Sequence, residues 1–183
     1  MNDPFNIPAV STALQVELTD MLEARERRAR IQEQLLSAHG LPVISFTMNI
    51  PGPVKLLPHA TEAFQESLAA VENALSRRGL AIICRESIRE KTGWEEFLCV
   101  RTSPESLKRI TVEIEERDPV GRLCDLDVIR PDGSKVSRED IGFPGRKCLL
   151  CGEPAHACSR SRRHSVEELT EEIERILQGR YGK

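Results

Sequence analysis

Apolar residues recur along much of the chain at intervals of three or four, which is the spacing that puts them on one face of an α-helix. The clearest example lies at 61–78, and Gly79 follows it as a stop signal. Its apolar stripe consists of Phe64, Leu68, Val71 and Leu75. This segment is therefore predicted to be a helix with one buried side.

Three other segments carry helix signals at their ends. Thr19 and Asp20 favour a cap and a first helical turn, and a second helix is predicted at about 25–38. Ser103, which is followed by a proline and an acidic residue, is typical of a helix start. The last helix is predicted at about 165–178, where a capping box precedes a clear apolar stripe.

Strands are indicated by alternation of apolar and polar residues or by short apolar runs. The segment 43–50 alternates, whereas 80–84 and 97–100 are short apolar runs with a hairpin-like turn between them at 91–93. Together, the helices and strands predict an α+β domain in which a mixed β-sheet is flanked by helices.

Two carboxylates interrupt the apolar run at 121–130. Because the side chains of a strand alternate between its faces, Asp125 and Asp127 are expected to point the same way. Two like charges so close are tolerated best with a cation between them, and Mg²⁺ is a common choice beside phosphates. Gly121 would let a ligand approach the backbone, and Arg122 would offer forked donors to phosphate. The alternative is a half-exposed strand with solvated aspartates.

A turn signal follows this strand and predicts a returning partner strand at 134–137. The residues after it, such as Asp140, would then supply a third carboxylate beside the pair. Arg130 would flank the pair with a second guanidinium.

Further cations indicate where a polyphosphate would bind. In the loop at 51–55, Gly52 lies between two prolines and permits a tight turn that would present backbone N–H groups and Lys55 to a ligand. Arg25 and Arg28 share a face of the arginine-rich first helix and form a candidate phosphate clamp. Each signal has a structural alternative, namely a rigid connector for the loop and a solvated face for the helix.

The segment at about 144–164 contains three cysteines and a histidine in the order C-x2-C-x6-C-x5-H. Three thiolates and one imidazole make a complete tetrahedral set for Zn²⁺, and the first cysteine pair has the spacing of a zinc knuckle. His156 competes as the fourth ligand, and free thiols packed in a loop are the alternative. Arg146 and its basic neighbours would either activate the thiols or bind an anion. The candidate ligands are Cys148, Cys151, Cys158 and His164.

The length of 183 residues fits a single domain over 1–183, with the Cys/His-rich loop at about 144–164 and the C-terminal helix at about 165–178. The net charge of -3 implies no bulk attraction to nucleic acid or to a membrane. Asp3 and Pro4 stand where a signal peptide needs positive charge followed by an apolar block. We therefore expect a cytoplasmic protein with reduced cysteines.

Several motifs in this order resemble one family. The sequence is similar to the apo-citrate lyase phosphoribosyl-dephospho-CoA transferase family from about Thr19 to the final helix. The motifs are SFT at 45–47, PGPVK at 51–55, GRLCDLDV at 121–128, RKCLLC at 146–151 and CSRSRRH at 158–164.

Members of that family attach a prosthetic group to the acyl-carrier subunit of citrate lyase. The resemblance implies that 2'-(5''-triphosphoribosyl)-3'-dephospho-CoA is the donor, that a carrier serine is the acceptor and that diphosphate leaves. It also implies that Asp125 and Asp127 hold Mg²⁺ on the triphosphate. Arg122, Lys55 and one of the first-helix arginines would then take up the remaining negative charge.

The aspartate pair also resembles the D-x-D strand of nucleotidyltransferases, and a nucleotidyltransferase-like fold is expected on that basis. The Gly-Ser turn that such enzymes usually carry on a helix ahead of the aspartates is absent here. A second hypothesis, from a different class, makes the protein a zinc-stapled, non-catalytic module that binds an acidic carrier-like partner through its arginines.

Overall fold

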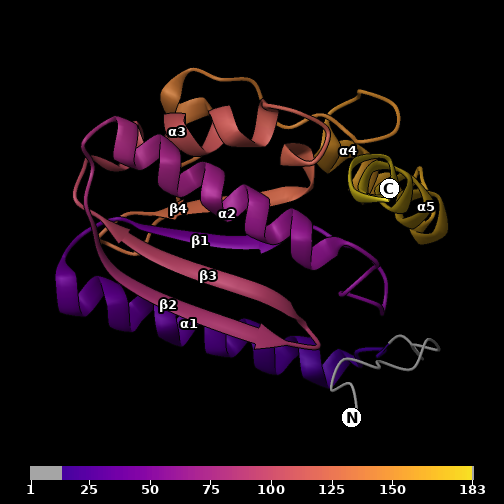
Figure 1. Cartoon of the computed structure of the whole chain (residues 1–183), viewed down its shortest axis with the longest axis horizontal. Coiled ribbons are helices and arrows are strands. Elements are labelled where there is room, and N and C mark those ends of the chain that lie inside the picture. The colour runs from indigo at the N-terminus through magenta and orange to yellow at the C-terminus, as the bar shows by residue number, and fades with distance from the viewer. Residues whose placement is uncertain (1–13, 183) are drawn as a thin grey trace, which may run out of the picture.

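The computed structural model describes residues 14–182, so the expectation about Asp3 and Pro4 lies outside the described residues. A four-stranded sheet with the order β2-β3-β1-β4 forms its centre (Figure 1). The strands are β1 (Val43–Met48), β2 (Ile82–Glu90), β3 (Gly93–Val100) and β4 (Cys124–Ile129). The helices are α1 (Leu18–His39), α2 (Ala60–Arg77), α3 (Pro104–Glu116), α4 (Ala155–Ser161) and α5 (Val166–Tyr181), with short 3₁₀ turns at η1 (Gly121–Leu123) and η2 (Glu139–Ile141).

Every pair of neighbouring strands is antiparallel, so the prediction of a mixed sheet is wrong. β1 and β2 do run in the same direction, with α2 between them in the sequence, but β3 lies between them in the sheet. β3 and β4 are likewise separated by β1. This is the split β-α-β-β-α-β arrangement, which agrees with the predicted α+β class. The strand order does not establish a nucleotidyltransferase-like fold, which stays a prediction.

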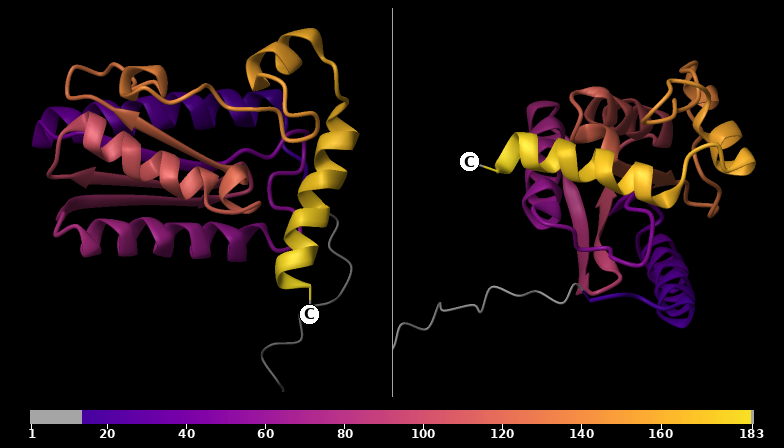
Figure 2. Two further views of the ribbon diagram at one scale, coloured as in Figure 1. Left: turned by 90° about the horizontal axis from the view of Figure 1, so that it is seen from above. Right: turned by 90° about the vertical axis from the view of Figure 1, so that its right-hand side faces the viewer.

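Helices cover both faces of the sheet (Figures 1 and 2). α2 and α3 pack on one face, where the sheet contributes Ile44, Phe46, Leu98, Leu126 and Val128 to the largest hydrophobic cluster. α1 covers the other face, where Leu35 and Leu36 belong to a cluster with Val43, Phe97 and Ile129. This second face also carries the polar positions of β1 and β4, because alternate residues of a strand point to opposite sides.

α1 is one continuous helix, so the break predicted at about residue 25 is wrong. Its N-cap is Glu17, and Asp20 completes a capping box by accepting a hydrogen bond from the Glu17 backbone N–H at 2.8 Å. No glycine or proline interrupts the helix, and Gly40 ends it in the left-handed conformation, as expected. The buried stripe of α2 and the caps of α3 and α5 agree with the sequence.

The β2–β3 hairpin is longer than the two predicted apolar runs. Its additional residues are mostly charged, and they pair across the sheet. Arg89 Nη2 lies 2.7 Å from Glu96 Oε2, and Arg85 Nε lies 3.1 Å from Glu96 Oε1. Charged residues can occupy a strand where a partner on the neighbouring strand neutralises them, and an apolar pattern does not reveal such pairing.

The partner strand predicted at 134–137 is reduced to a single bridge. Lys135 pairs with Ile129, and the Val136 N–H donates to the Val128 carbonyl at 2.8 Å. β4 is therefore an edge strand of the sheet.

α5 lies across the end of the sheet at which β1 ends and β4 begins (Figure 2). Its Ile173 and Leu177 are buried in a separate cluster with Leu57, Ala63 and Leu123. No helix within residues 14–182 has the length and apolar character needed to span a bilayer.

Candidate active site

The two aspartates of β4 point to the face of the sheet that α1 covers. Asp125 pairs with Thr47 and Asp127 with Ser45 across the antiparallel β1–β4 register. Both aspartates are half-buried, whereas the residue between them, Leu126, is buried on the opposite face. The alternation predicted from the sequence is therefore present, and the two carboxylates are neighbours on one side of the strand.

The surroundings of the pair disfavour two negative charges. Burial and the neighbouring Asp127 raise the pKa of the Asp125 carboxyl. Cationic side chains already lie against both residues: Arg146 Nη1 is 3.6 Å from Asp125 Oδ1, and Lys135 Nζ contacts Asp127 Oδ2. The Lys135 ammonium thus lies at a position from which a bound metal cation would also neutralise the aspartate pair.

The free edge of β4 is held by two buried side chains of α3. The Leu126 N–H donates to Glu115 Oε1 at 2.9 Å, and Lys108 Nζ donates to the Leu126 carbonyl at 3.1 Å. Arg138 Nη2 lies 2.6 Å from Glu115 Oε2 and completes the arrangement. Sequence reasoning missed this clamp, although Lys108 and Glu115, seven residues apart, are polar residues on the buried side of a predicted helix.

A first cavity of about 220 Å³ is lined by residues from the first half of α1, the end of β1 and the β2–β3 turn. We call it the α1 cavity. Its lining includes Arg25 and Arg28 from α1, Lys55 from the loop after β1 and Asp125 from β4. The candidate clamp of Arg25 and Arg28 and the loop residue Lys55, which the sequence suggested separately, thus line the same cavity as one carboxylate of the pair.

Lys55 and Arg25 form a cationic spot in this cavity. Burial and the nearby charge of Arg25 lower the pKa of Lys55. Lys55 Nζ donates to the Ile50 carbonyl at 2.6 Å, and the ion pairs within residues 14–182 include none to Lys55 or Arg25. Neighbouring cations without a counter-ion make a favourable place for an anion.

Glu95 is a site residue that sequence reasoning missed. It lies in the same row of the sheet as Asp125, with Thr47 between them. Its side chain is only 2% exposed, and Oε2 accepts a hydrogen bond from Arg28 Nε at 2.7 Å. Oε1 has no hydrogen-bond partner among the described residues. A glutamate adjoining the apolar run of a buried strand was the available signal, because such a charge needs a partner.

A second cavity of about 530 Å³ lies between η1, the segment 144–164 and α5. We call it the α5 cavity. Its cationic lining residues are Arg122, Arg146, Lys147 and Arg162, and its apolar ones include Leu123, Leu149, Leu169 and Ile173. Asn49 lines both cavities. Because Arg146 also pairs with Asp125, the two cavities meet at this carboxylate.

The two predicted glycines line neither cavity. Gly121 is buried, and a Cβ at this position would lie 2.2 Å from the carbonyl oxygen of Ile114, so its role is close packing of η1 on α3. Gly52 has φ 76°, lies beside Val166 of α5 and lines a third hollow. Packing thus closes off Gly121, and a ligand contact at Gly52 stays a prediction.

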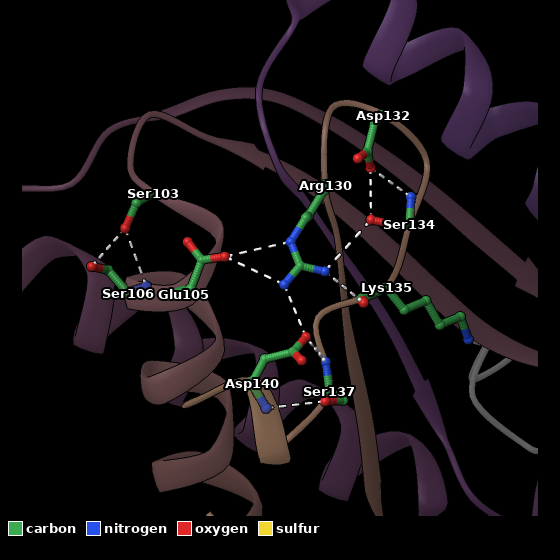
Figure 3. Close-up of polar contacts among 9 residues, drawn as sticks. All are labelled: Ser103, Glu105, Ser106, Arg130, Asp132, Ser134, Lys135, Ser137 and Asp140. Atoms are coloured by element: carbon green, nitrogen blue, oxygen red, sulfur yellow. Dashed lines mark hydrogen bonds and ion pairs between the residues drawn. The ribbon is translucent and has the colours of Figure 1, made fainter. Parts of the chain in front are cut away.

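Arg130 does not flank the aspartate pair, contrary to the prediction. Its guanidinium is enclosed by the carboxylates of Glu105 and Asp140 and by the carbonyl of Lys135 (Figure 3). Asp140 also accepts a hydrogen bond from the Ser137 N–H at 3.0 Å. The third carboxylate expected from this segment instead fixes the loop after β4.

The predicted zinc ligands come together in the segment 144–164. One ligand atom from each lies within 4.8 Å of the others, and Cys151 Sγ is 3.4 Å from Cys158 Sγ. His164 Nε2 is buried without a hydrogen-bond partner among the described residues, whereas His156 is exposed and outside the cluster. Gly152 turns the chain after the first pair with φ 73°. The cluster of Cys148, Cys151, Cys158 and His164 could hold a metal ion such as zinc.

Comparison with known proteins assigns the family. A family model described as apo-citrate lyase phosphoribosyl-dephospho-CoA transferase matches residues 16–180. The chain belongs to this family. The resemblance expected from the sequence motifs is thereby confirmed.

Three relatives show how far the likeness to this transferase family extends. A protein of Vibrio cholerae serotype O1 (strain M66-2), named probable apo-citrate lyase phosphoribosyl-dephospho-CoA transferase, is 40% identical over 164 residues, covering 89% of this chain and 92% of the relative. A protein of Streptococcus pyogenes serotype M18 with the same name is 38% identical, with coverages of 92% and 88%. An apo-citrate lyase phosphoribosyl-dephospho-CoA transferase of Citrobacter koseri is 31% identical, with 93% of each chain covered.

The stretch matched to the transferase family contains every candidate site residue, from Arg25 to His164. Both cavities, the aspartate pair and the Cys/His cluster thus belong to the part of the chain that is shared with the family.

Proposed function

We propose that the protein transfers the phosphoribosyl-dephospho-CoA group from 2'-(5''-triphosphoribosyl)-3'-dephospho-CoA to a serine of the acyl-carrier subunit of citrate lyase, in the cytoplasm. The serine oxygen would bond to the phosphorus nearest the donor ribose, and the bond from that phosphorus to the outer diphosphate would break. Membership of the transferase family over residues 16–180 is the observation that carries this proposal.

Asp125 and Asp127 would hold a divalent cation, Mg²⁺ in the first instance. The fit rests on two adjacent carboxylates in an environment that disfavours their combined charge, and on a lysine ammonium already bound to one of them. When bound, Mg²⁺ neutralises phosphate oxygens and the charge that develops on leaving diphosphate. Arg146, which pairs with Asp125, orients this carboxylate from the other side.

The cations around the pair would bind the donor. In transfer at phosphorus a protein mainly positions the groups and neutralises charge, and the nucleophile can belong to the partner. Lys55, Arg25 and Arg28 lie on one side of Asp125, and Arg122 lies on the other. No activated serine is required of this chain, because the acceptor hydroxyl arrives on the carrier.

The Cys/His cluster would hold one structural Zn²⁺. Four donor atoms within 4.8 Å of one another and a buried imidazole nitrogen without a partner support this assignment. The site would use all four ligands, which is typical of zinc that stabilises a segment and takes no part in chemistry. It would fix Arg146 and its neighbours in the segment beside β4.

Asp125→Asn tests the proposed transferase. The substitution keeps the shape of the side chain and removes its charge, so transfer to purified apo-carrier in the presence of Mg²⁺ should slow by about 100-fold or more. The mass gain of the carrier, followed by mass spectrometry, measures the rate. Asp132→Asn is the matched control, because Asp132 is an exposed residue of the turn after β4 and should transfer at the wild-type rate.

An unchanged rate of transfer in Asp125→Asn would overturn the role given to the aspartate pair, whereas a wild-type protein that adds no mass to the carrier would favour the zinc-stapled binding module. That module would bind the apo-carrier without adding mass to it, in the wild type as well as in the variant.

A further inference from the structure

The two cavities differ in size and in chemistry. The α1 cavity is the smaller, at about 220 Å³ against about 530 Å³, and three cations, Arg25, Arg28 and Lys55, line it. The α5 cavity is lined by guanidinium and ammonium groups together with an apolar wall from η1, the segment 144–164 and α5. A compact polyanion suits the first lining, whereas a ligand with both phosphates and apolar parts suits the second.

Asp125 separates these two spaces. It lines the α1 cavity, and its Oδ1 lies 3.6 Å from Arg146, which lines the α5 cavity. Asn49 borders both spaces, so they are neighbours rather than distant pockets. A ligand that spans the carboxylate must therefore place one of its ends in each cavity.

The start of α5 contributes both polar and apolar groups to the larger cavity. Ser165 and Val166, at the N-terminus of this helix, line the α5 cavity together with Arg162. The cation at this end is the Arg162 guanidinium, because the capping box already bonds the N–H groups of Ser165 and Glu168. Leu169 and Ile173, one and two turns further on, supply the apolar wall.

We propose that the two ends of the donor bind in different cavities: the leaving diphosphate in the α1 cavity and the dephospho-CoA part in the α5 cavity. This inference rests on the proposed function, because it assigns the parts of that donor to the site. The bond that breaks joins the two parts, and it would lie beside Asp125. The adenine and pantetheine would contact the apolar wall, and the internal diphosphate of dephospho-CoA would face the cations.

Binding of two donor fragments tests this division without any turnover. The probes are inorganic diphosphate with Mg²⁺ and 3'-dephospho-CoA, each titrated into the full-length enzyme by calorimetry. Arg25→Ala should weaken diphosphate binding about tenfold and change dephospho-CoA binding by less than about twofold. Leu169→Trp, which fills the α5 cavity, should show the opposite pattern.

Matched controls separate these effects from misfolding. Arg30→Ala removes an exposed arginine of α1 outside both cavities, and Glu171→Trp adds the same bulk as Leu169→Trp on a different side of α5. Both should bind both probes as the wild type does. Lys147→Ala, which removes an exposed cation of the α5 cavity without adding bulk, should weaken dephospho-CoA selectively even where Leu169→Trp fails to fold.

The division is overturned if Arg25→Ala and Lys147→Ala weaken both probes equally, or if the wild type binds neither probe. Those results leave the transferase proposal standing as long as Asp125→Asn slows transfer by about 100-fold or more. Conversely, normal transfer by Asp125→Asn removes the proposed mechanism, whatever the two probes show.

Discussion

At the scale of single residues, Asp125 illustrates a conflict between function and stability. Burial and Asp127 raise its pKa, and these effects outweigh the favourable charge of Arg146. An acid whose folded-state pKa lies above its unfolded value stabilises the fold only while it is protonated. The stabilising contribution of protonated Asp125 is fully present below pH 3.8, the ordinary pKa of an aspartate, and it is lost as the pH rises through the folded-state pKa.

Asp125→Asn should therefore be more stable than the wild type at neutral pH, even though it loses activity. We expect a rise of about 1–2 °C in Tm at pH 7, which shrinks toward zero as the pH falls to about 4. Thermal unfolding without divalent cations, between pH 3.5 and 7.5, measures it. Asp132→Asn should give no such gain, because hydrogen bonds from Ser134 lower the pKa of Asp132. A lower Tm for Asp125→Asn at pH 7 would contradict this account.

The places of Glu95 and Lys55 in the site depend on residues that are distant from them in the sequence. Glu95 stands beside a second glutamate in β3, Lys55 is the one charged residue of the loop 51–55, and neither belongs to a repeating pattern. The register Glu95–Thr47–Asp125 joins three strands that are distant in sequence, and Lys55 reaches the same cavity from a loop.

At the scale of elements, β4 depends on α3 as much as on its one neighbouring strand. An edge strand exposes unpaired backbone groups, and here Glu115 and Lys108 satisfy those of Leu126, between the two aspartates. Glu115 also neutralises Arg138, which is itself buried. The clamp thereby fixes the strand segment from which both carboxylates project.

Glu115→Ala should lower the free energy of unfolding by about 3 kcal/mol, because it leaves the buried Leu126 N–H without a partner and the buried Arg138 guanidinium with only the exposed Glu116. Urea denaturation measures the change. Glu116→Ala is the matched control: Glu116 also pairs with Arg138 but is 51% exposed, so its loss should cost less than about 1 kcal/mol. Equal losses in the two variants would show that the strand edge does not depend on the buried partner.

At the scale of the whole molecule, the segment 144–164 connects the sheet to α5. It contains one short helix, α4, and few buried apolar side chains, so the zinc ion would be its main source of order. Arg146 donates to the Cys124 carbonyl, and Arg122 Nη2 donates to the Cys148 carbonyl at 3.1 Å. The segment that carries the cluster is thus tied to η1 and to the start of β4, next to the aspartate pair.

Purified protein should contain about one zinc per chain by elemental analysis, and Cys158→Ala should remove it. We expect the Tm of that variant to fall by about 4–8 °C, which corresponds to about 2 kcal/mol. Cys84→Ala, a half-buried thiol of β2 outside the cluster, is the control and should retain zinc. Zinc-free wild-type protein from zinc-supplemented medium would identify the four residues as ordinary side chains.

The sequence by itself determined features that depend on local spacing. The period of two placed Asp125 and Asp127 on one side of a strand, the stripe of α2 marked a helix, and the C-x2-C pair with a later cysteine and histidine marked the cluster that could hold a metal ion. The family motifs likewise lie in short, contiguous segments. Such features need only the geometry of one element, which neighbouring residues specify.

Tertiary structure alone decided which elements meet. It inserted β3 between β1 and β2, and so replaced the expected mixed sheet with an antiparallel one. It also turned Arg130 and Asp140 toward each other and away from the site, and brought Glu95 and the clamp of Glu115 into it. Strand pairing and charge pairing join residues far apart in the chain, and their energies depend on burial and on partners that no local pattern contains.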